Sequence, residues 1–587
     1  MRQDRLAAVN TPLVGERART AYGVRPQAGA STRAEARDWA LYLATTLSLL
    51  AGLIALYWSY HNNLLLSYND AMGHLNIARR VFDSRTPGLV QLGTVWLPLP
   101  HLLMQPFIYS NFLWHTGLAA SIVGLICFVI TAIALFQSVR LITTHPAAPW
   151  IGLIVFIANP NMLYMQTTAL TEPVLLMTLT ASSYYLLRWS HSRAPGQLML
   201  GGFLALLAVW SRYDGWFFAV CGGIIVVATI LLAPLHTRAG QGDVADTGPA
   251  FRRGRPRPGR LTLAESAGIV YGFLPVYGMV AWICYNWIIF GDPLEFQRGQ
   301  YSAGYQQSQA ALAGQLPTQH NLWLSITTYA WATFDNLGGV VLACAGVGVL
   351  LYLLTVRLRA DGLVPYLFLA ALPFNVLALW TGQTIIRTLH TSDNYFNVRY
   401  GLLLLPAAAI FIAYAADWLL RRIPAAVIVP LIGGLLAIQT ALWIPSWPMS
   451  VPTVADGLLG ASSSRLGPSP TESSGQFLHA NYTGGGILID DDFYFVRAFI
   501  ESGLDMREYI AVFSGPLYHE ALRDPARYAE WVVLTPHSAI SQQAVVIDSP
   551  DFASRYTLQF RDDSAGVMIY RRTASGATPS AVSSNGH

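Results

Sequence analysis

A carboxylate and an imidazole follow the first apolar stretch of the chain, at Asp70 and His74 within the segment SYNDAMGH of residues 67–74. A carboxylate beside a substrate hydroxyl can accept its proton during a reaction, which is general-base catalysis. Residues 70–81 have the pattern of a short amphipathic helix, so His74 lies one turn further on the same face, where it can orient the carboxylate or contact a substrate. A structural role for Asp70 is the alternative, because a carboxylate at a helix start caps unpaired N–H groups and is favoured by the helix dipole.

Other charged residues lie where apolar stretches begin or end. Glu172 precedes a proline, Arg212 and Asp214 are two residues apart, and Arg399 is followed by Tyr400. A guanidinium group presents a fork of N–H donors that matches phosphate oxygens, so the two arginines are candidate phosphate ligands. Each residue also has a plain structural interpretation. Glu172 suits the first turn of a helix, Arg212 and Asp214 can pair weakly with each other, and Arg399 can anchor a helix at the membrane surface.

The composition indicates that a membrane surrounds the elements that carry these residues. Of the 587 residues, 53% are hydrophobic and only 12% are charged. Apolar runs long enough to cross a bilayer recur through the first three-quarters of the chain. We predict a polytopic α-helical membrane protein with about eleven spans, at 39–60, 113–139, 148–165, 172–188, 197–211, 216–234, 266–290, 337–356, 363–381, 401–420 and 425–446.

Arginines near the span ends predict the orientation, because basic residues gather in cytoplasmic loops. A cytoplasmic N-terminus, with an arginine-rich disordered leader at 1–38, puts five basic groups on the cytoplasmic side. These are Arg140, Arg188 with Arg193, the arginines of 252–257, Arg357 with Arg359, and Arg421 with Arg422. The first outer loop is then 61–112, and Asp70, Glu172, Arg212 and Arg399 all lie on the outer side.

The odd number of spans places the segment after residue 446 outside the plasma membrane. Its composition changes to Pro, Ser and Gly and then to mixed polar sequence, with runs typical of strands at 486–490, 531–534 and 566–570 and a helical pattern at 494–503. We predict a small extracytoplasmic α/β domain at 447–573 and a disordered tail at 574–587.

The sequence argues against several classes of partner and site. All 36 basic residues are arginine and the net charge is only +4, which gives no basis for nucleic-acid binding. The four cysteines all fall within apolar spans, where no disulfide framework or paired-cysteine metal site is expected. We expect no cofactor and no metal.

The order and side of these motifs resemble the GT-C superfamily of integral-membrane glycosyltransferases. The resemblance is greatest to the protein O-mannosyltransferase and aminoarabinose transferase group, glycosyltransferase family 39 and its relatives. It covers about 39–446 and rests on Asn69-Asp70, the stretch from Pro160 to Glu172-Pro173, Arg212-Tyr213-Asp214-Gly215, Gly291-Asp292-Pro293-Leu294-Glu295-Phe296, and Arg399-Tyr400 leading to Leu405-Pro406.

The resemblance implies transfer of a sugar from a polyprenyl phosphate, whose lipid tail lies among the helices, to a lipid, glycan or protein acceptor outside the membrane. It implies that Asp70 is the catalytic base of an inverting reaction. The donor phosphate is then held by Arg399 and Arg212. The implied sugar and acceptor contacts are His74, Glu172, Asp214 and Tyr400. The chain departs from the protein mannosyltransferases at Asn69, where they carry a second acid, so the resemblance does not identify protein as the acceptor.

Three alternatives follow from the same residues. A transferase of the same fold can use a lipid-diphosphate-linked oligosaccharide and a divalent metal, for which Asp70, His74, Glu172 and Asp214 are the candidate ligands. A lipid-linked sugar transporter or flippase is the alternative from another class, although its usual internal repeats and mid-membrane polar groups are not found in the sequence. A catalytically silent scaffold is the third.

Overall fold

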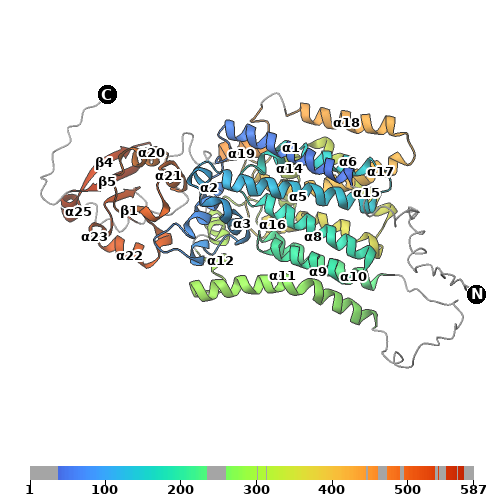
Figure 1. Cartoon of the computed structure of the whole chain (residues 1–587), viewed down its shortest axis with the longest axis horizontal. Helices are drawn as coiled ribbons and strands as arrows, with labels where there is room; N and C mark the ends of the chain where they lie inside the picture. Colours follow the sequence, from blue (N-terminus) through green and yellow to red (C-terminus); the bar gives the residue numbers. More distant parts are fainter. Residues whose placement is uncertain are drawn as a thin grey trace, which may run out of the picture.

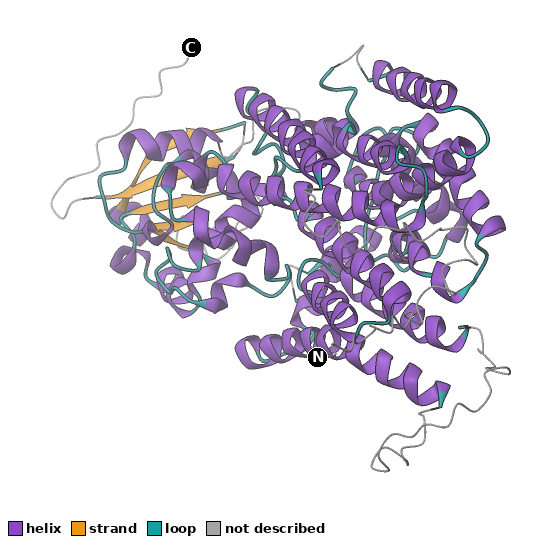
Figure 2. Cartoon of the chain, turned by 45° about the vertical axis from the view of Figure 1, so that its right-hand side comes forward, coloured by secondary structure: helices purple, strands orange, loops and turns teal. Residues whose placement is uncertain are grey.

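A computed structural model describes residues 38–233, 259–299, 302–312, 314–443, 447–460, 472–489, 495–535, 540, 550–564 and 566–573. The leader before residue 38, the basic loop at 252–257 and the tail from 574 onward lie outside the described residues. Among the described residues, helices form one long bundle and the strands gather at one end of the molecule (Figures 1 and 2).

Every predicted span coincides with a helix or a pair of helices. The helices are α1 (Trp39–His61), α5 (Leu118–Ile142), α6 (Ala148–Ile157) with α7 (Pro160–Met165), α8 (Glu172–Ser192), α9 (Pro195–Val209), α10 (Asp214–Leu231), α11 (Arg260–Phe290), α15 (Gly339–Thr355), η5 (Val364–Leu369) with α16 (Ala371–Trp380), η6 (Val398–Leu404) with α17 (Leu405–Leu420), and α18 (Ala425–Ala441). By length and composition, five of the described helices can cross a membrane, or up to seven when each bent pair is one span. The total of eleven therefore stays a prediction.

Two ion-paired groups mark one end of the bundle. Arg140 near the end of α5 pairs with Asp38 at the start of α1, and Arg421 pairs with Asp417 in α17. Asp417 also accepts hydrogen bonds from the backbone N–H groups of Thr144 and His145, at 2.9 and 2.7 Å. The sequence assigned Arg140 and Arg421 to one side of the membrane, and they lie at one end of the bundle. Which end faces the cytoplasm stays a prediction.

The opposite end, called the α2 end here, carries short helices that lie outside the predicted spans. The expected amphipathic helix is α2 (Asn69–Arg80), and the proline-rich stretch after it forms η2 (Leu89–Leu92) and the start of α3 (Leu99–Ile108). The sequence did not predict α14 (Leu322–Leu337), which meets α15 at a bend of 112°. The other short helices between α3 and α14 are α4 (Asn111–His115), α12 (Glu295–Arg298) and α13 (Ala303–Leu312). At the far end of α15 lies η4 (Ala360–Gly362), whose Asp361 interacts with Arg193 after α8.

The predicted C-terminal sheet is present, with more strands than the sequence indicated. Its order is β2-β1-β3-β5-β4, with β1 (Ile487–Ile489) parallel to β2 (Tyr509–Ile510) and β3 (Trp531–Leu534), and β5 (Val567–Arg572) antiparallel to β3 and β4 (Tyr556–Asp562). The predicted runs correspond to β1, β3 and β5. The helices around the sheet are α20 (Glu472–Asn481), α21 (Val496–Glu501), η7 (Met506–Glu508), η8 (Val512–Ser514), α22 (Pro516–Arg523), α23 (Pro525–Tyr528) and α25 (Pro550–Arg555).

This domain is attached to α2 by buried polar contacts. The side-chain amide of Asn76 donates to the carbonyl of Val496 in α21 at 3.0 Å. Asp83, just after α2, pairs with Arg507 at 2.8 Å and accepts the backbone N–H of Met506 at 3.2 Å. The α2 end of the bundle and the sheet domain therefore share an interface along α2, as Figure 1 also shows.

Candidate active site

Arg399 is buried at the centre of a charged cluster at the α2 end of the bundle. Its Nη2 donates to Asp70 Oδ2 at 2.6 Å, and its Nε donates to Glu172 Oε1 at 3.0 Å. Its Nη1 lies 3.9 Å from Asp456 Oδ2. Three carboxylates from distant parts of the sequence thus surround one guanidinium.

Arg212 extends the cluster on the other side of Glu172. Its Nη1 donates to Glu172 Oε1 at 2.9 Å and its Nε donates to Asp214 Oδ2 at 3.0 Å. Glu172 is fully buried, and one of its two carboxylate oxygens, Oε1, accepts a hydrogen bond from each arginine. The predicted local pair of Arg212 and Asp214 is therefore present, but it belongs to a larger network.

Close packing of backbone positions both arginines. Arg399 lies in η6, and a Cβ atom on Gly401 would come within 2.2 Å of the carbonyl oxygen of Ala332 in α14. Arg212 lies in the turn between α9 and α10, where a Cβ on Gly215 would come within 2.1 Å of the carbonyl oxygen of Ala208. Glycine at these positions lets the backbones approach closely, so the arginines are fixed to rigid elements.

Two tyrosine rings lie against the guanidinium groups. The ring centroid of Tyr400 is 4.6 Å from the Cζ of Arg212 and 5.2 Å from that of Arg399. The ring of Tyr68 lies 5.1 Å from the Cζ of Arg399. Such cation–π contacts stabilise a buried guanidinium without using its hydrogen-bond donors.

Asp70 is the most exposed carboxylate of the cluster, with 29% of its side chain accessible. It lies in the first turn of α2, but Tyr68 is the N-cap residue and no side chain caps the helix. The N-cap part of the structural alternative is therefore wrong, whereas Asp70 does lie in the first turn, where the helix dipole favours a carboxylate. Its partner is instead Arg399, which is 329 residues away in the sequence.

His74 lies on the same face of α2 but packs inside the loop region. Its Nδ1 is 2.9 Å from His101 Nε2, and its ring stacks against Trp96 with centroids 4.1 Å apart. Burial and the nearby arginines lower the pKa of His74 to about 3, so the imidazole is neutral. It joins α2 to α3, and its predicted contact with a substrate stays a prediction.

Other polar residues expected at the outer edge lie in separate contacts. His390 is 3.2 Å from Asp335 and stacks on Trp331. Asp292 accepts the backbone N–H of Leu294 at 2.9 Å, which is a local turn after α11. Among the described residues, the hydrogen bonds and ring contacts of His390 and Asp292 involve neighbours outside the cluster.

Asp456 is the site residue that sequence reasoning missed. It lies in α19 (Pro452–Gly460), which follows the last predicted span and packs against α7, α14 and η6 of the bundle. The region was interpreted as a Pro-, Ser- and Gly-rich beginning of the outer domain. An acid in such a stretch gives no local signal that it faces Arg399, which lies in a different, earlier segment of the chain.

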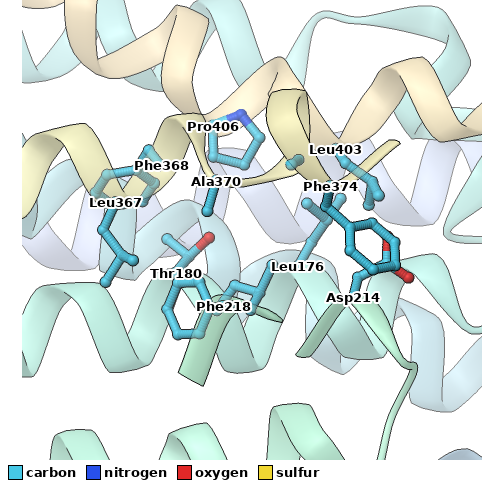
Figure 3. Close-up of a pocket in the computed structure, with 12 residues that line it drawn as sticks. Leu176, Thr180, Asp214, Phe218, Leu367, Phe368, Ala370, Phe374, Leu403 and Pro406 are labelled. Carbon is cyan, nitrogen blue, oxygen red and sulfur yellow. The ribbon is translucent and has the colours of Figure 1, made fainter. Parts of the chain in front are cut away.

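An apolar pocket opens beside the cluster. Asp214 lies at one end of it with Phe374, and Leu367 and Phe368 lie at the other (Figure 3). The lining comes from α8, α10, η5, α16, α17 and the end of η6. Among the described residues, Asp214 Oδ1 and Glu172 Oε2 are buried and have no hydrogen-bond partner, so each is an acceptor available to a donor group.

Comparisons with known proteins give a likeness of fold and none of sequence. No protein-family profile matches the chain, and no curated protein is similar to it in sequence. Among solved structures, the fold is similar to that of ArnT from Cupriavidus metallidurans bound to undecaprenyl phosphate. The TM-score is 0.50 at 13% identity, and the match covers 93% of this chain and 100% of ArnT.

The likeness supports the polytopic helical membrane fold predicted from the sequence. The match extends over nearly the whole chain, so it includes the C-terminal region as well as the bundle. Chemically, the site offers one partly exposed carboxylate, two guanidinium groups held by aromatic rings and carboxylates, and an apolar pocket beside them.

Proposed function

We propose that this chain is an inverting glycosyltransferase of the GT-C type that takes a sugar from a polyprenyl phosphate and transfers it to an acceptor hydroxyl outside the membrane. The observation that carries the proposal is the direct contact of Asp70 with Arg399 at 2.6 Å. It brings a candidate base and a candidate phosphate ligand from opposite ends of the bundle sequence into one site.

The apolar pocket supports a ligand that is part lipid. A phosphate carrying an isoprenoid chain needs cationic donors for its head and apolar surface for its tail. Arg212 and Arg399 offer the first, and the pocket that begins at Asp214 offers the second. ArnT, whose fold this chain shares, was crystallised with undecaprenyl phosphate, a ligand of this kind.

In the proposed reaction, the acceptor hydroxyl attacks the anomeric carbon of the donor sugar as Asp70 takes its proton. The new bond joins the acceptor oxygen to that carbon, and the bond from carbon to phosphate oxygen breaks. The electron pair leaves with the polyprenyl phosphate, whose charge Arg399 and Arg212 stabilise. Attack from the face opposite the leaving group inverts the configuration.

Asp70 contacts Arg399 through Oδ2, and we propose that this contact breaks before the carboxylate takes the hydroxyl proton. A donor phosphate at Arg399 competes with Asp70 for the Nη2 group. Donor binding therefore releases the base, and we expect the donor to bind before the acceptor is deprotonated. Glu172, Asp214 and Tyr400 border the same space and are proposed to contact the sugar or the acceptor.

A transfer assay on the purified chain tests the proposal. A panel of polyprenyl-phosphate sugars is supplied with candidate acceptors, and mass spectrometry identifies the products. Transfer from at least one donor that continues in the presence of chelator is the expected result. Transfer only from lipid diphosphates, lost on chelation, would support the metal-dependent alternative. Net movement of lipid-linked sugar across reconstituted vesicles without any product would support a transporter.

A further inference from the structure

The charged cluster contains more carboxylates than guanidinium groups. Among the described residues, its ion pairs join Asp70, Glu172, Asp214 and Asp456 to only two arginines, Arg212 and Arg399. Arg212 and three of the carboxylates are buried or nearly so, and Asp70 is the exception. A lipid phosphate that enters this site adds negative charge to a region that already has an excess of it, so a compensating positive charge is required.

Asp456 is placed so that protonation of its carboxylate can compensate the added negative charge. Its Oδ2 accepts the backbone N–H of Val398 at 3.1 Å and the hydroxyl of Tyr68 at 3.3 Å, and lies 3.9 Å from Arg399 Nη1. Arg399 thus donates close hydrogen bonds to Asp70 and Glu172 but makes only a longer contact with Asp456. Asp456 can lose its charge without loss of either short ion pair.

The surroundings of Asp456 favour its neutral form. The titratable and charged groups that face it are Tyr68 and Asp70 of the α2 segment, Tyr164 of α7, Tyr395 just before η6, and Arg399 in η6. Only Arg399 among these is a cation. Burial, which outweighs the opposing effects of Arg399, Tyr68 and Val398, raises the pKa of Asp456 to about 6.

We infer that Asp456 is a positioning residue for the lipid phosphate, and that it takes up one proton when a phosphate anion binds Arg399. The inference rests on the function proposed above. It assigns a role in the site to α19, a helix that belongs to neither the predicted spans nor the sheet. Asp456 acts through Arg399 and η6 and touches no reacting atom.

The sign of the expected pH dependence follows from this coupling. The bound anion makes the charged form of Asp456 less favourable, so its pKa is higher in the complex than in the free protein. Affinity is then greatest at or below about pH 6, where Asp456 is already protonated, and falls as pH rises above that value. The dissociation constant rises up to tenfold per pH unit when one proton is taken up.

Binding of undecaprenyl methyl phosphate to the purified full chain tests the inference. This phosphodiester carries one constant charge between pH 5 and 9, so any titration belongs to the protein. Wild-type affinity is expected to fall several-fold between pH 6 and 8. In Asp456→Asn the fall is expected to disappear, with affinity at pH 8 several-fold tighter than that of the wild type. Difference infrared spectra should show a protonated carboxyl on binding that Asp456→Asn lacks.

Asp335→Asn is the matched control, since Asp335 is another buried carboxylate at this end that pairs with His390 instead of Arg399. It should leave the pH dependence as in the wild type. Probe binding that is constant from pH 5 to 9 in the wild type, or a pH dependence lost in Asp335→Asn instead, would overturn the inference while leaving the proposed function intact. No binding at any pH would overturn the proposed function itself. The wild-type profile needs no variant, so a misfolded Asp456→Asn does not prevent the test.

Discussion

Two buried arginines at the α2 end of the bundle are held in opposite ways. Arg79 of α2 donates to Asp83 at 2.7 Å, to the carbonyls of Ile108 and Tyr109 at 2.9 and 3.0 Å, and to Asn111 at 2.6 Å. Asp83 in turn has both oxygens bonded, to Arg507 and to the N–H of Met506 and Arg79. Around Arg399 and Arg212, by contrast, Glu172 Oε2 and Asp214 Oδ1 have no hydrogen-bond partner in the part of the chain that the structure describes.

Under the proposed function, this difference is the one expected between a structural arginine and a ligand-binding one. The donors of Arg79 are used by fixed protein groups, including three backbone or amide acceptors that cannot leave without exposing a buried charge. Arg399 is bound instead by carboxylates, one of which is partly exposed and can move away. A phosphate can replace Asp70 on Arg399, whereas nothing replaces the carbonyls on Arg79.

The largest expected effect is on catalysis at Asp70. Asp70→Asn should lower the rate of sugar transfer about 10²–10⁴-fold, the usual contribution of a positioned base, because the amide cannot accept the proton. Donor binding and folding should be largely kept. Turnover of the purified variant, measured beside its donor affinity, checks both. Asp417→Asn, which removes a buried carboxylate at the opposite end of the bundle, should keep transfer near the wild-type rate. Full turnover by Asp70→Asn would exclude Asp70 as the base.

Substitution of Arg79 should lower the stability of the fold and leave ligand binding largely unchanged. Arg79→Met removes one of the two arginine partners of the fully buried Asp83 and the link from α2 to Asn111 and the sheet domain. Breaking a buried ion pair on one side destabilises by about 3–5 kcal/mol. The unfolding free energy in detergent should fall by that amount, while donor affinity of the folded fraction stays within about twofold. A folded variant of normal stability that fails to bind donor would reverse the comparison.

Arg399→Ala should affect ligand binding before stability. Hydrogen bonds to charged groups contribute about 1.5–3 kcal/mol, so donor affinity should weaken about 10- to 100-fold. Arg212→Ala should weaken it less, because Arg212 is held by Asp214 and Glu172 on the side away from Asp70. Equilibrium binding of the polyprenyl-phosphate sugar measures both variants. An unchanged affinity in Arg399→Ala would mean that another group holds the phosphate.

The part of this site that the sequence revealed is the part that lies at span ends. Glu172, Arg212 and Arg399 were found because a charged residue beside a long apolar run is conspicuous, and Asp70 because a short amphipathic pattern follows it. The helical fold was predictable for the same reason, since hydropathy is a strong local signal. Pairing of Asp70 with Arg399 across 329 residues is a tertiary contact, which no local pattern encodes.

The features that the sequence did not reveal depend on tertiary packing. The α14 helix is apolar enough to be read with α15 as one span, yet the bend between them is 112°. The position of Asp456 follows from how α19 folds back onto α7 and η6, and Arg79 had no feature to distinguish it from other basic residues of the outer loop. His74 shares a helical face with Asp70, but its ring is enclosed by Trp96 and His101.

The smallest expected effect is that of a substitution at Tyr68. It tests how the contacts of Arg399 differ from those of Arg79. Tyr68→Phe keeps the ring over Arg399 but removes the hydroxyl that donates to Asp456 and to the carbonyl of Thr453. The lost hydrogen bonds should lower stability by only about 0.5–1.5 kcal/mol. The hydroxyl stabilises the charged form of Asp456, so its removal raises the pKa of that carboxyl further.

The consequence for ligand binding has a definite sign. With a higher pKa, Asp456 stays protonated to a higher pH, so the fall in affinity for undecaprenyl methyl phosphate should begin above its wild-type onset. Tyr164→Phe removes a neighbouring buried hydroxyl that donates to the carbonyl of Leu64, and it should leave the onset unchanged. If the onset moves to lower pH in Tyr68→Phe, or moves equally in both variants, then the hydroxyl of Tyr68 does not control the protonation of Asp456. The network around Arg399 would then be purely structural, like the one around Arg79.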